Sequence, residues 1–287
     1  MTTAAAALEA PKRIRTPVPL LVAGLAFIIA FGQPMATLVR DWWSDPDAGH
    51  GLLLFPVALW LAWRRGLTEP TPQPRLGLAL LIAAVILRYL SGLAAELFTM
   101  RASLLGAALA LVIYFRGYRQ ILRWWLPVAL IALSIPLPAV VLGSLALPLQ
   151  LRASEWGAAL LHARHVPVRL TGNVILLPGR SLFVTEACSG LRSLTALLAL
   201  GLLVGGLWLR TWWARTLLVA AAIPVAMALN AFRVFLTGFL VFYVNPALAE
   251  GTMHLTEGWF IFLFAFAILG ALSWLLASVE GLRRPAT

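Results

Sequence analysis

Charged residues are scarce in this 287-residue chain, and their scarcity excludes a water-soluble domain. They make up 11% of the sequence, whereas a typical soluble domain has about 25%. Hydrophobic residues make up 61%, and the mean hydropathy is +0.91. A soluble fold of this size cannot hide so much apolar surface, whereas lipid solvates it. The composition therefore indicates an integral membrane protein.

The chain has a single cysteine, Cys188. One cysteine excludes an intramolecular disulfide and any zinc or iron–sulfur site built on several thiolates. His162 and His165 have the i, i+3 spacing that helix-borne metal ligands use, but no acidic third ligand accompanies them at a fixed spacing. We therefore expect neither a metal nor another cofactor.

Several common motifs are also missing. There is no Gly-x-Ser-x-Gly nucleophile elbow, no phosphate-binding loop and no dinucleotide fingerprint. The formal net charge of +11 raises the question of nucleic acid, but the basic residues cluster in short loops between apolar runs. This is the pattern of membrane topology, so we expect no nucleic-acid partner.

Apolar runs recur along the whole chain, and a spanning helix needs roughly 20 residues. They lie at about 17–38, 51–63, 76–95, 102–115, 120–140, 189–209, 216–244 and 258–278. The second and fourth runs reach spanning length when they are extended through neighbouring Gly, Ser or Thr. The sequence thus predicts an all-α polytopic membrane protein with about eight transmembrane helices.

The charges orient these helices. With the N-terminus in the cytoplasm, the inside loops hold Lys12, Arg13, Arg15, Arg64, Arg65, Arg75, Arg116, Arg119, Arg123, Arg210, Arg215, Arg283 and Arg284. The acids of the outside loops are Asp41, Asp45, Asp47, Glu96, Glu155, Glu186, Glu250 and Glu257. Every short loop then satisfies the positive-inside rule, which predicts that both termini are cytoplasmic.

The domain organisation follows from this topology. We expect a disordered cytoplasmic tail at 1–16, one integral membrane domain at 17–280 and a cytoplasmic tail at 281–287. The extracytoplasmic segment 141–187 is the only sizeable part outside the membrane. No separate soluble domain fits.

The extracytoplasmic segment changes character along its length. Residues 142–163 interleave apolar and polar side chains at helical spacing, which suits an amphipathic helix in the interface plane. Turn signals then follow at Thr171-Gly172-Asn173 and Pro178-Gly179-Arg180, between β-branched runs. They predict a small β-hairpin or meander that delivers the chain to Cys188.

Cys188 opens the sixth apolar run, where Thr185 or Ser189 can cap the helix. A thiol at a helix N-terminus feels the positive end of the macrodipole, and Arg192 at i+4 adds positive potential. The thiolate is the nucleophilic form, so this placement, flanked also by Glu186, suits covalent catalysis. The alternative is a buried cysteine that acts as a small hydrophobe.

Arg233 lies inside the seventh apolar run, with Asn230 at i−3 on the same face. A rise of about 1.5 Å per residue from Thr216 puts Arg233 roughly 25 Å across an apolar core about 30 Å thick. An intramembrane arginine usually faces the bundle interior or a wet cavity, where it can stabilise an oxyanion. The alternative is snorkelling to the outer headgroups.

His254 precedes the eighth run, again on the outside. An imidazole is well suited to accept a thiol proton and return it to a leaving amine, and Glu257 at i+3 can orient it. A solvated loop side chain is the alternative. Nucleophile, base and oxyanion stabiliser are thus predicted at one membrane boundary, and together they are what acyl transfer at a peptide bond requires.

These residues resemble the motifs of the exosortase/archaeosortase family, in the family's order. The resemblance rests on Glu186-Ala187-Cys188-Ser189-Gly190-Leu191-Arg192, on Asn230-Ala231-Phe232-Arg233-Val234 and on His254 with Gly258-Trp259. Upstream, the stretch from Trp43 through His50-Gly51 to Trp60 resembles a first-loop motif, although Ala48-Gly49 stands where a Ser often precedes the His. The match runs from about residue 40 to 278.

The resemblance implies a cysteine transpeptidase or protease of the cell (inner) membrane, with its site on the extracytoplasmic face. Its substrates would be exported proteins with a C-terminal sorting signal: a short motif, a membrane span and a basic tail. Cys188 would be the nucleophile, His254 the acid/base and Arg233 the stabiliser, with His50 a possible substrate contact. The cleaved protein would pass to an unknown acceptor at the cell surface.

Three other functions stay open at this point. A transporter would line its path with Arg233 and His254 and would tolerate Cys188→Ala. A membrane transferase of exopolysaccharide assembly would act on lipid-linked sugars, but would want clustered acids. A protease that releases its target to water would share the same acyl-enzyme.

Overall fold

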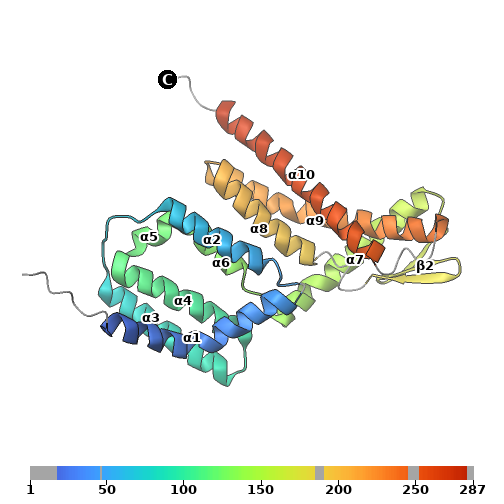
Figure 1. Ribbon diagram of the computed structural model, residues 1–287. Coiled ribbons are helices and arrows are strands. Elements are labelled where there is room, and N and C mark those ends of the chain that lie inside the picture. Colours follow the sequence, from blue (N-terminus) through green and yellow to red (C-terminus); the bar gives the residue numbers. More distant parts are fainter. Residues whose placement is uncertain (1–17, 46, 185–190, 245–251, 283–287) are drawn as a thin grey trace, which may run out of the picture.

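The computed structural model describes residues 18–45, 47–184, 191–244 and 252–282. This part of the chain is mostly helical, with one small sheet (Figure 1). Of the cysteine motif Thr185–Arg192, the structure describes only Leu191 and Arg192. Glu186, Cys188 and Ser189 therefore lie outside the described residues. The predicted terminal tails lie outside them as well, except that the last helix continues to Leu282.

The N-terminal half, residues 18–133, is a bundle of antiparallel helices. Its elements are α1 Val18–Ser44, α2 Gly51–Arg65, α3 Pro74–Leu93, α4 Leu97–Arg116, α5 Tyr118–Arg123 and α6 Trp125–Leu133. Helices α3 and α4 form a hairpin against which α1 packs through α4, and α2 packs against α6 (Figure 1).

Local sequence explains where these helices begin and end. Pro74 stands at the start of α3, where its missing N–H costs no hydrogen bond. Glu96 caps α4 by accepting hydrogen bonds from the backbone N–H groups of Phe98 at 3.0 Å and Thr99 at 2.7 Å. Gly117 has φ +87° and separates α4 from α5, and a Cβ there would lie 2.1 Å from a backbone oxygen of the α2–α3 loop.

A buried ion pair joins α1 to α4. The Nη2 of Arg101 lies 2.6 Å from the Oδ2 of Asp41, and the Arg101 side chain is only 3% exposed. The same Nη2 donates to the carbonyl of Thr37 at 3.1 Å. A buried guanidinium needs such partners because desolvation of an unpaired charge is costly.

The end of α6 is held by side chains from the end of α1 and from the loop that follows it. Trp42 donates its indole N–H to the carbonyl of Ser134 at 2.7 Å, and the His50 Nε2 lies 3.1 Å from the carbonyl oxygen of Leu133. Both carbonyls belong to the helix end, where intrahelical partners run out. Gly51 must be a glycine, because a Cβ there would lie 2.1 Å from the Trp42 Nε1.

The C-terminal half, residues 139–282, contains three long helices, one of 18 residues and the sheet. The helices are α7 Ala139–Ala163, α8 Leu191–Trp208, α9 Trp212–Tyr243 and α10 Thr252–Leu282. Helix α9 is central and packs against α7, α8 and α10. The two halves meet in an apolar core that contains Leu54, Ala58 and Leu61 of α2, Leu126 and Leu130 of α6, and Ala199 of α8.

A three-stranded antiparallel sheet follows α7, in the segment where a small hairpin or meander is expected. The strands are β1 Arg169–Thr171, β2 Val174–Leu177 and β3 Arg180–Phe183, in the order β1-β2-β3. The turns between them contain Gly172 and Gly179, both with positive φ. Ile175 of β2 is fully buried against α7 and α9, so the sheet lies over the far ends of these two helices (Figure 1).

Five helices of the described chain are long and apolar enough to cross a membrane: Leu21–Ser44, Pro74–Leu93, Leu97–Arg116, Trp212–Tyr243 and Phe260–Gly281. The other three apolar runs are shorter helices. The uninterrupted run expected at 120–140 is wrong, because α5 ends at Arg123, α6 begins at Trp125 and α6 stops at Leu133. The number of eight spans stays a prediction.

The outer surface of these helices is strongly apolar. Large side chains such as Ile29 and Trp63 are 75% and 80% exposed, and many others share this exposure. Water would make such a surface aggregate, whereas hydrocarbon tails solvate it. The helix exteriors therefore suit a lipid environment.

Candidate active site

The candidate site is built on a close contact between α7 and α9, which run side by side in the same direction. A Cβ on Gly157 of α7 would lie 2.6 Å from the Val234 Cγ1, and a Cβ on Gly238 of α9 would lie 2.7 Å from the Leu161 Cδ1. Small residues let helix backbones approach closely where lipid supplies no hydrophobic driving force. This contact fixes the register of α7 on α9.

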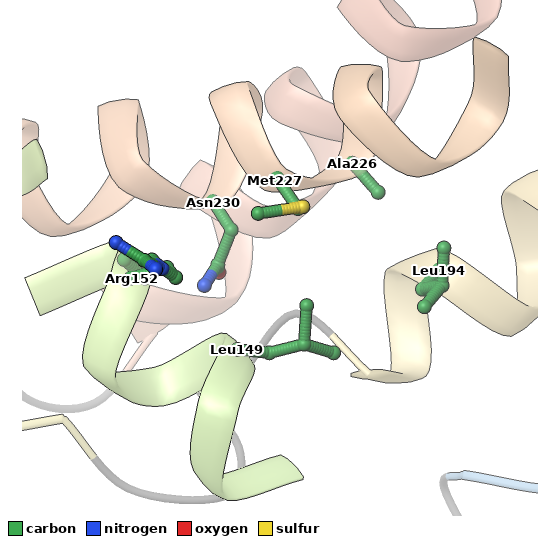
Figure 2. Close-up of a pocket in the computed structure, with 7 residues that line it drawn as sticks. Leu149, Arg152, Leu194, Ala226, Met227 and Asn230 are labelled. Carbon is green, nitrogen blue, oxygen red and sulfur yellow. The ribbon is translucent and has the colours of Figure 1, made fainter. Parts of the chain in front are cut away.

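One turn toward the N-terminal ends of α7 and α9, these two helices and α8 enclose a cavity. Leu149, Arg152 and Ala153 of α7, Leu194 of α8, and Ala226, Met227 and Asn230 of α9 line it (Figure 2). Its volume is about 10 Å³, which is room for about one water molecule. The Asn230 side chain is directed toward α7 (Figure 2) and is 5% exposed. The cavity is thus a small apolar space with one buried amide and one guanidinium at its wall.

Arg233 stands one helical turn beyond Asn230 on α9, as the i−3 spacing predicts. Arg233 is partly buried, and its Nε atom is buried. Arg152 lines the cavity, and its Nη1 donates to the Glu155 Oε2 at 3.1 Å, so its charge is paired within α7. Arg233 adds a second guanidinium one turn beyond Asn230 on α9.

The position of Cys188 lies outside the described residues, but the chain is described on both sides of it. Before it, β3 ends at Phe183 and the chain is described to Val184; after it, α8 begins at Leu191. Leu194, which lines the cavity, belongs to the first turn of α8. Arg192 is the second residue of this helix, and its side chain lies outside the described part.

The chain that leads to Cys188 is held by two amide side chains that the sequence did not single out. Asn173 donates to the carbonyl of Val184 at 3.1 Å and to the Oε1 of Gln150 at 3.4 Å. The Val184 N–H donates in return to the Asn173 carbonyl at 3.0 Å. Gln150 of α7 is 6% exposed. We call these three residues the Asn173 clamp.

His254 and Glu257 belong to the first turns of α10, which begins at Thr252. The helix therefore begins before His254, whereas the stretch that is apolar enough to cross a membrane begins at Phe260. His254 thus precedes the last candidate span, as the sequence predicts. The side chains of His254 and Glu257 lie outside the described residues, whereas α10 itself packs against α8 and α9.

The structure does not bring His50 to the cavity wall. Its ring contacts the end of α6 instead, as described above. Arg152 and Met227, by contrast, line the cavity although sequence reasoning assigned them no role. The helical spacing of α7 places Arg152 on a defined face of that helix. Which element packs against this face could not be known without the fold. Among the described residues, no group of three or more His, Cys, Asp or Glu side chains gathers to hold a metal.

One comparison with known proteins decides the family. The sequence model described as Transmembrane exosortase (Exosortase_EpsH) matches residues 42–271. The chain belongs to the transmembrane exosortase family. The range matched includes all the residues that line the cavity, together with positions 188, 233 and 254. A search of curated proteins and a search of solved structures each found no match. This exosortase is a multi-pass membrane protein with mostly helical structure.

Proposed function

We propose that this exosortase is a cysteine transpeptidase or endopeptidase that cleaves C-terminal sorting signals of exported proteins at the outer face of the cytoplasmic membrane. The observation that carries the proposal is the cavity beside the start of α8. Leu194, which lines this cavity, follows Cys188 by six residues in the sequence. Asn230 lines this cavity, and Arg233 follows it by one turn. A thiol nucleophile, a cation and an amide donor are groups that acyl transfer requires.

The roles follow from the chemistry of these groups. The Cys188 thiolate attacks the scissile carbonyl carbon, and the resulting oxyanion is stabilised by Arg233 and by the amide of Asn230. The C–N bond then breaks, and His254 donates a proton to the leaving amine. A thioester on Cys188 remains. An acceptor amine yields transpeptidation and water yields hydrolysis, with Cys188 released in both cases.

The Asn173 clamp supports this assignment, because a nucleophile needs a defined position. The clamp joins α7 to Val184, which precedes Cys188 by four residues. A misplacement of about 1 Å costs about 100-fold in rate. Asn173 and Gln150 are therefore positioning residues for the nucleophile.

The proposed topology has eight crossings, both termini in the cytoplasm and the site outside. Contacts between loops agree with it. Thr68 contacts Gln120, so two loops expected inside meet each other. Trp42, expected in an outside loop, contacts Ser134, which lies toward the outer end of the predicted run 120–140. The substrate would cross beside the enzyme, with its scissile bond at the depth of Cys188 and its basic tail in the cytoplasm.

The test is processing of a co-expressed protein that carries a C-terminal motif, span and basic tail. We expect wild type to shorten it, Cys188→Ala to abolish processing and Arg233→Gln to reduce it at least 100-fold. Arg180→Gln removes one exposed cation from β3 and is the matched control, with no expected effect. All variants are first quantified in membranes.

The reaction products distinguish the remaining candidate functions. Full processing by Cys188→Ala would contradict the nucleophile and favour a transporter or a transferase of exopolysaccharide assembly. Cleavage with addition of water identifies an endopeptidase, and a product joined to an amine identifies a transpeptidase. A thioester on Cys188, released by hydroxylamine, is the expected intermediate in both.

A further inference from the structure

Three arginines from distant parts of the sequence meet around Trp125. The Cζ of Arg65, the last residue of α2, lies 5.6 Å from the Trp125 ring centroid, and the Cζ of Arg215, near the start of α9, lies 5.0 Å from it. Arg65 also donates to the Arg123 carbonyl at 2.9 Å, and the Arg123 Nε donates to the Arg65 carbonyl. We call Arg65, Arg123 and Arg215 the arginine cluster.

The charges of this cluster are not balanced by contacts with carboxylates. Within the described residues, none of the three guanidinium groups has a carboxylate oxygen within 4 Å. The two ion pairs in this part of the chain are Arg101–Asp41 and Arg152–Glu155, which lie on other helices. Arg65 is close enough to Arg123 and Arg215 to be repelled by both. Glu280 lies within electrostatic reach of Arg215. Its carboxylate is bound by the neutral backbone N–H groups of Arg210 and Thr211, so it offsets part of the charge of the cluster from a distance. The Arg215 Nε and Nη2 donate to the Leu209 carbonyl at 3.0 and 2.8 Å, which orients this guanidinium without neutralising it.

Gathering like charges has a free-energy cost that a bound anion would offset. The cluster is accessible to one, since Arg123 is exposed and Arg65 and Arg215 are only partly buried. Guanidinium groups bind phosphate bidentately, and Trp rings typically lie at the headgroup level of a bilayer. Basic pockets between transmembrane helices bind anionic headgroups in this way.

We propose that the arginine cluster binds the phosphate of an anionic phospholipid headgroup, such as phosphatidylglycerol. The site joins the two halves of the molecule, because Arg65 and Arg123 belong to the N-terminal half and Arg215 to α9. The headgroup therefore holds α2 and α5 against α9, at the end of the molecule where α9 begins. This binding is independent of the proposed peptidase chemistry.

The test is a titration of the purified full-length protein, in a neutral detergent, with phosphatidylglycerol or phosphatidylcholine, with bound lipid counted by native mass spectrometry. We expect wild type to prefer phosphatidylglycerol at least tenfold. The double variant Arg65→Gln/Arg215→Gln should weaken phosphatidylglycerol binding about 10- to 30-fold, since each arginine near a membrane surface contributes about a factor of five. Its thermal stabilisation by this lipid should disappear.

The matched control is Arg64→Gln/Arg75→Gln. Arg64 neighbours Arg65 but lies over Trp60, at 5.1 Å, and Arg75 is exposed at the start of α3. This variant removes the same charge and should bind within about threefold of wild type. Equal losses in both double variants would overturn the site in favour of a diffuse surface charge.

Two further arms distinguish the source of the phosphate and guard against misfolding. Inorganic phosphate at millimolar concentration should not displace the lipid; displacement would identify a free-phosphate site and overturn the lipid assignment. Arg65→Lys/Arg215→Lys keeps the charge and should retain binding within about threefold. A folded Lys variant that binds as weakly as the Gln variant would contradict the electrostatic basis.

Discussion

The two halves of this exosortase use the same polar residue types differently. In the N-terminal half, polar side chains hold helices together: the buried Arg101 pairs with Asp41, and the partly exposed His50 contacts the end of α6. In the C-terminal half, Arg152 and Asn230 line a cavity beside the start of α8. An arginine or histidine in a membrane protein is therefore not by itself a mark of catalysis. What distinguishes the two uses is whether the side chain lines this cavity, as Arg152 and Asn230 do and as Arg101 and His50 do not.

The largest expected effect on stability comes from the Arg101–Asp41 pair. Arg101→Leu leaves the Asp41 carboxylate without its partner and should destabilise the protein by about 3–5 kcal/mol. Thermal unfolding in detergent measures this loss. Arg101→Leu/Asp41→Leu should recover much of it, and a double variant no better than the single one would contradict a structural role for the pair.

Asn230→Leu tests the other half. It replaces the one amide among the described residues of the cavity wall by an apolar group of similar size, and we expect processing of a sorting-signal substrate to fall about 100-fold. The folded protein should lose at most about 1–3 kcal/mol of stability. If processing survives and only the melting temperature falls, Asn230 acts like the polar groups of the N-terminal half. That result would contradict the difference between the two halves.

His50→Ala sharpens the comparison from the opposite side. The loss of its contact with the Leu133 carbonyl should cost about 1 kcal/mol of stability. Processing per folded molecule should stay the same. A variant with normal melting and a raised KM would instead support the substrate contact that the first-loop motif suggested.

The smallest effect is expected at Glu96, which caps α4 just before a membrane span. Hydrogen bonds from the Thr99 side chain and backbone, ahead of the opposing effect of burial, hold the pKa of Glu96 below its usual value. The cap therefore stabilises the fold above pH of about 4 and is lost as the pH falls through the lowered pKa.

Melting curves of wild type and Glu96→Gln across this range check the prediction. The difference between the two should be about 1 kcal/mol at neutral pH and should shrink in acid. A difference that grows as the pH falls would have the wrong sign for a capping carboxylate.

Much of this architecture could be predicted from composition and periodicity. The helical membrane class, the helix that carries Arg233 and the pairing of Asn230 with Arg233 on one face follow from hydropathy and from a repeat of 3.6 residues. The break at Trp124 was missed because Ile121 and Leu122 were joined to the apolar run that follows, although Gln120 and Arg123 interrupt it. The start of α10 at Thr252 could not be placed from hydropathy, because Thr252, His254, Thr256 and Glu257 lower the mean hydropathy of its first turns.

Tertiary contacts account for what the sequence could not supply at the site. The role of Gln150 depends on Asn173 reaching it across the sheet, over 23 residues of sequence. The contact of His50 with α6 spans 83 residues. No local sequence pattern encodes contacts between residues so far apart in the chain. The first-loop motif therefore did not indicate which surface the His50 ring contacts.

The central claim is that Cys188 meets the cavity between α7, α8 and α9, and cross-linking tests it directly because the native chain has one cysteine. Met227→Cys places a second thiol on the cavity wall, and Leu217→Cys places one on an exposed turn near the start of α9 as a control. A protease site inserted after Arg210 lets a cross-link be seen as two fragments that stay joined. Oxidation should join Cys188 to position 227 and not to position 217. A cross-link to 217 alone, or to neither while both thiols react with maleimide, would contradict the site proposed here.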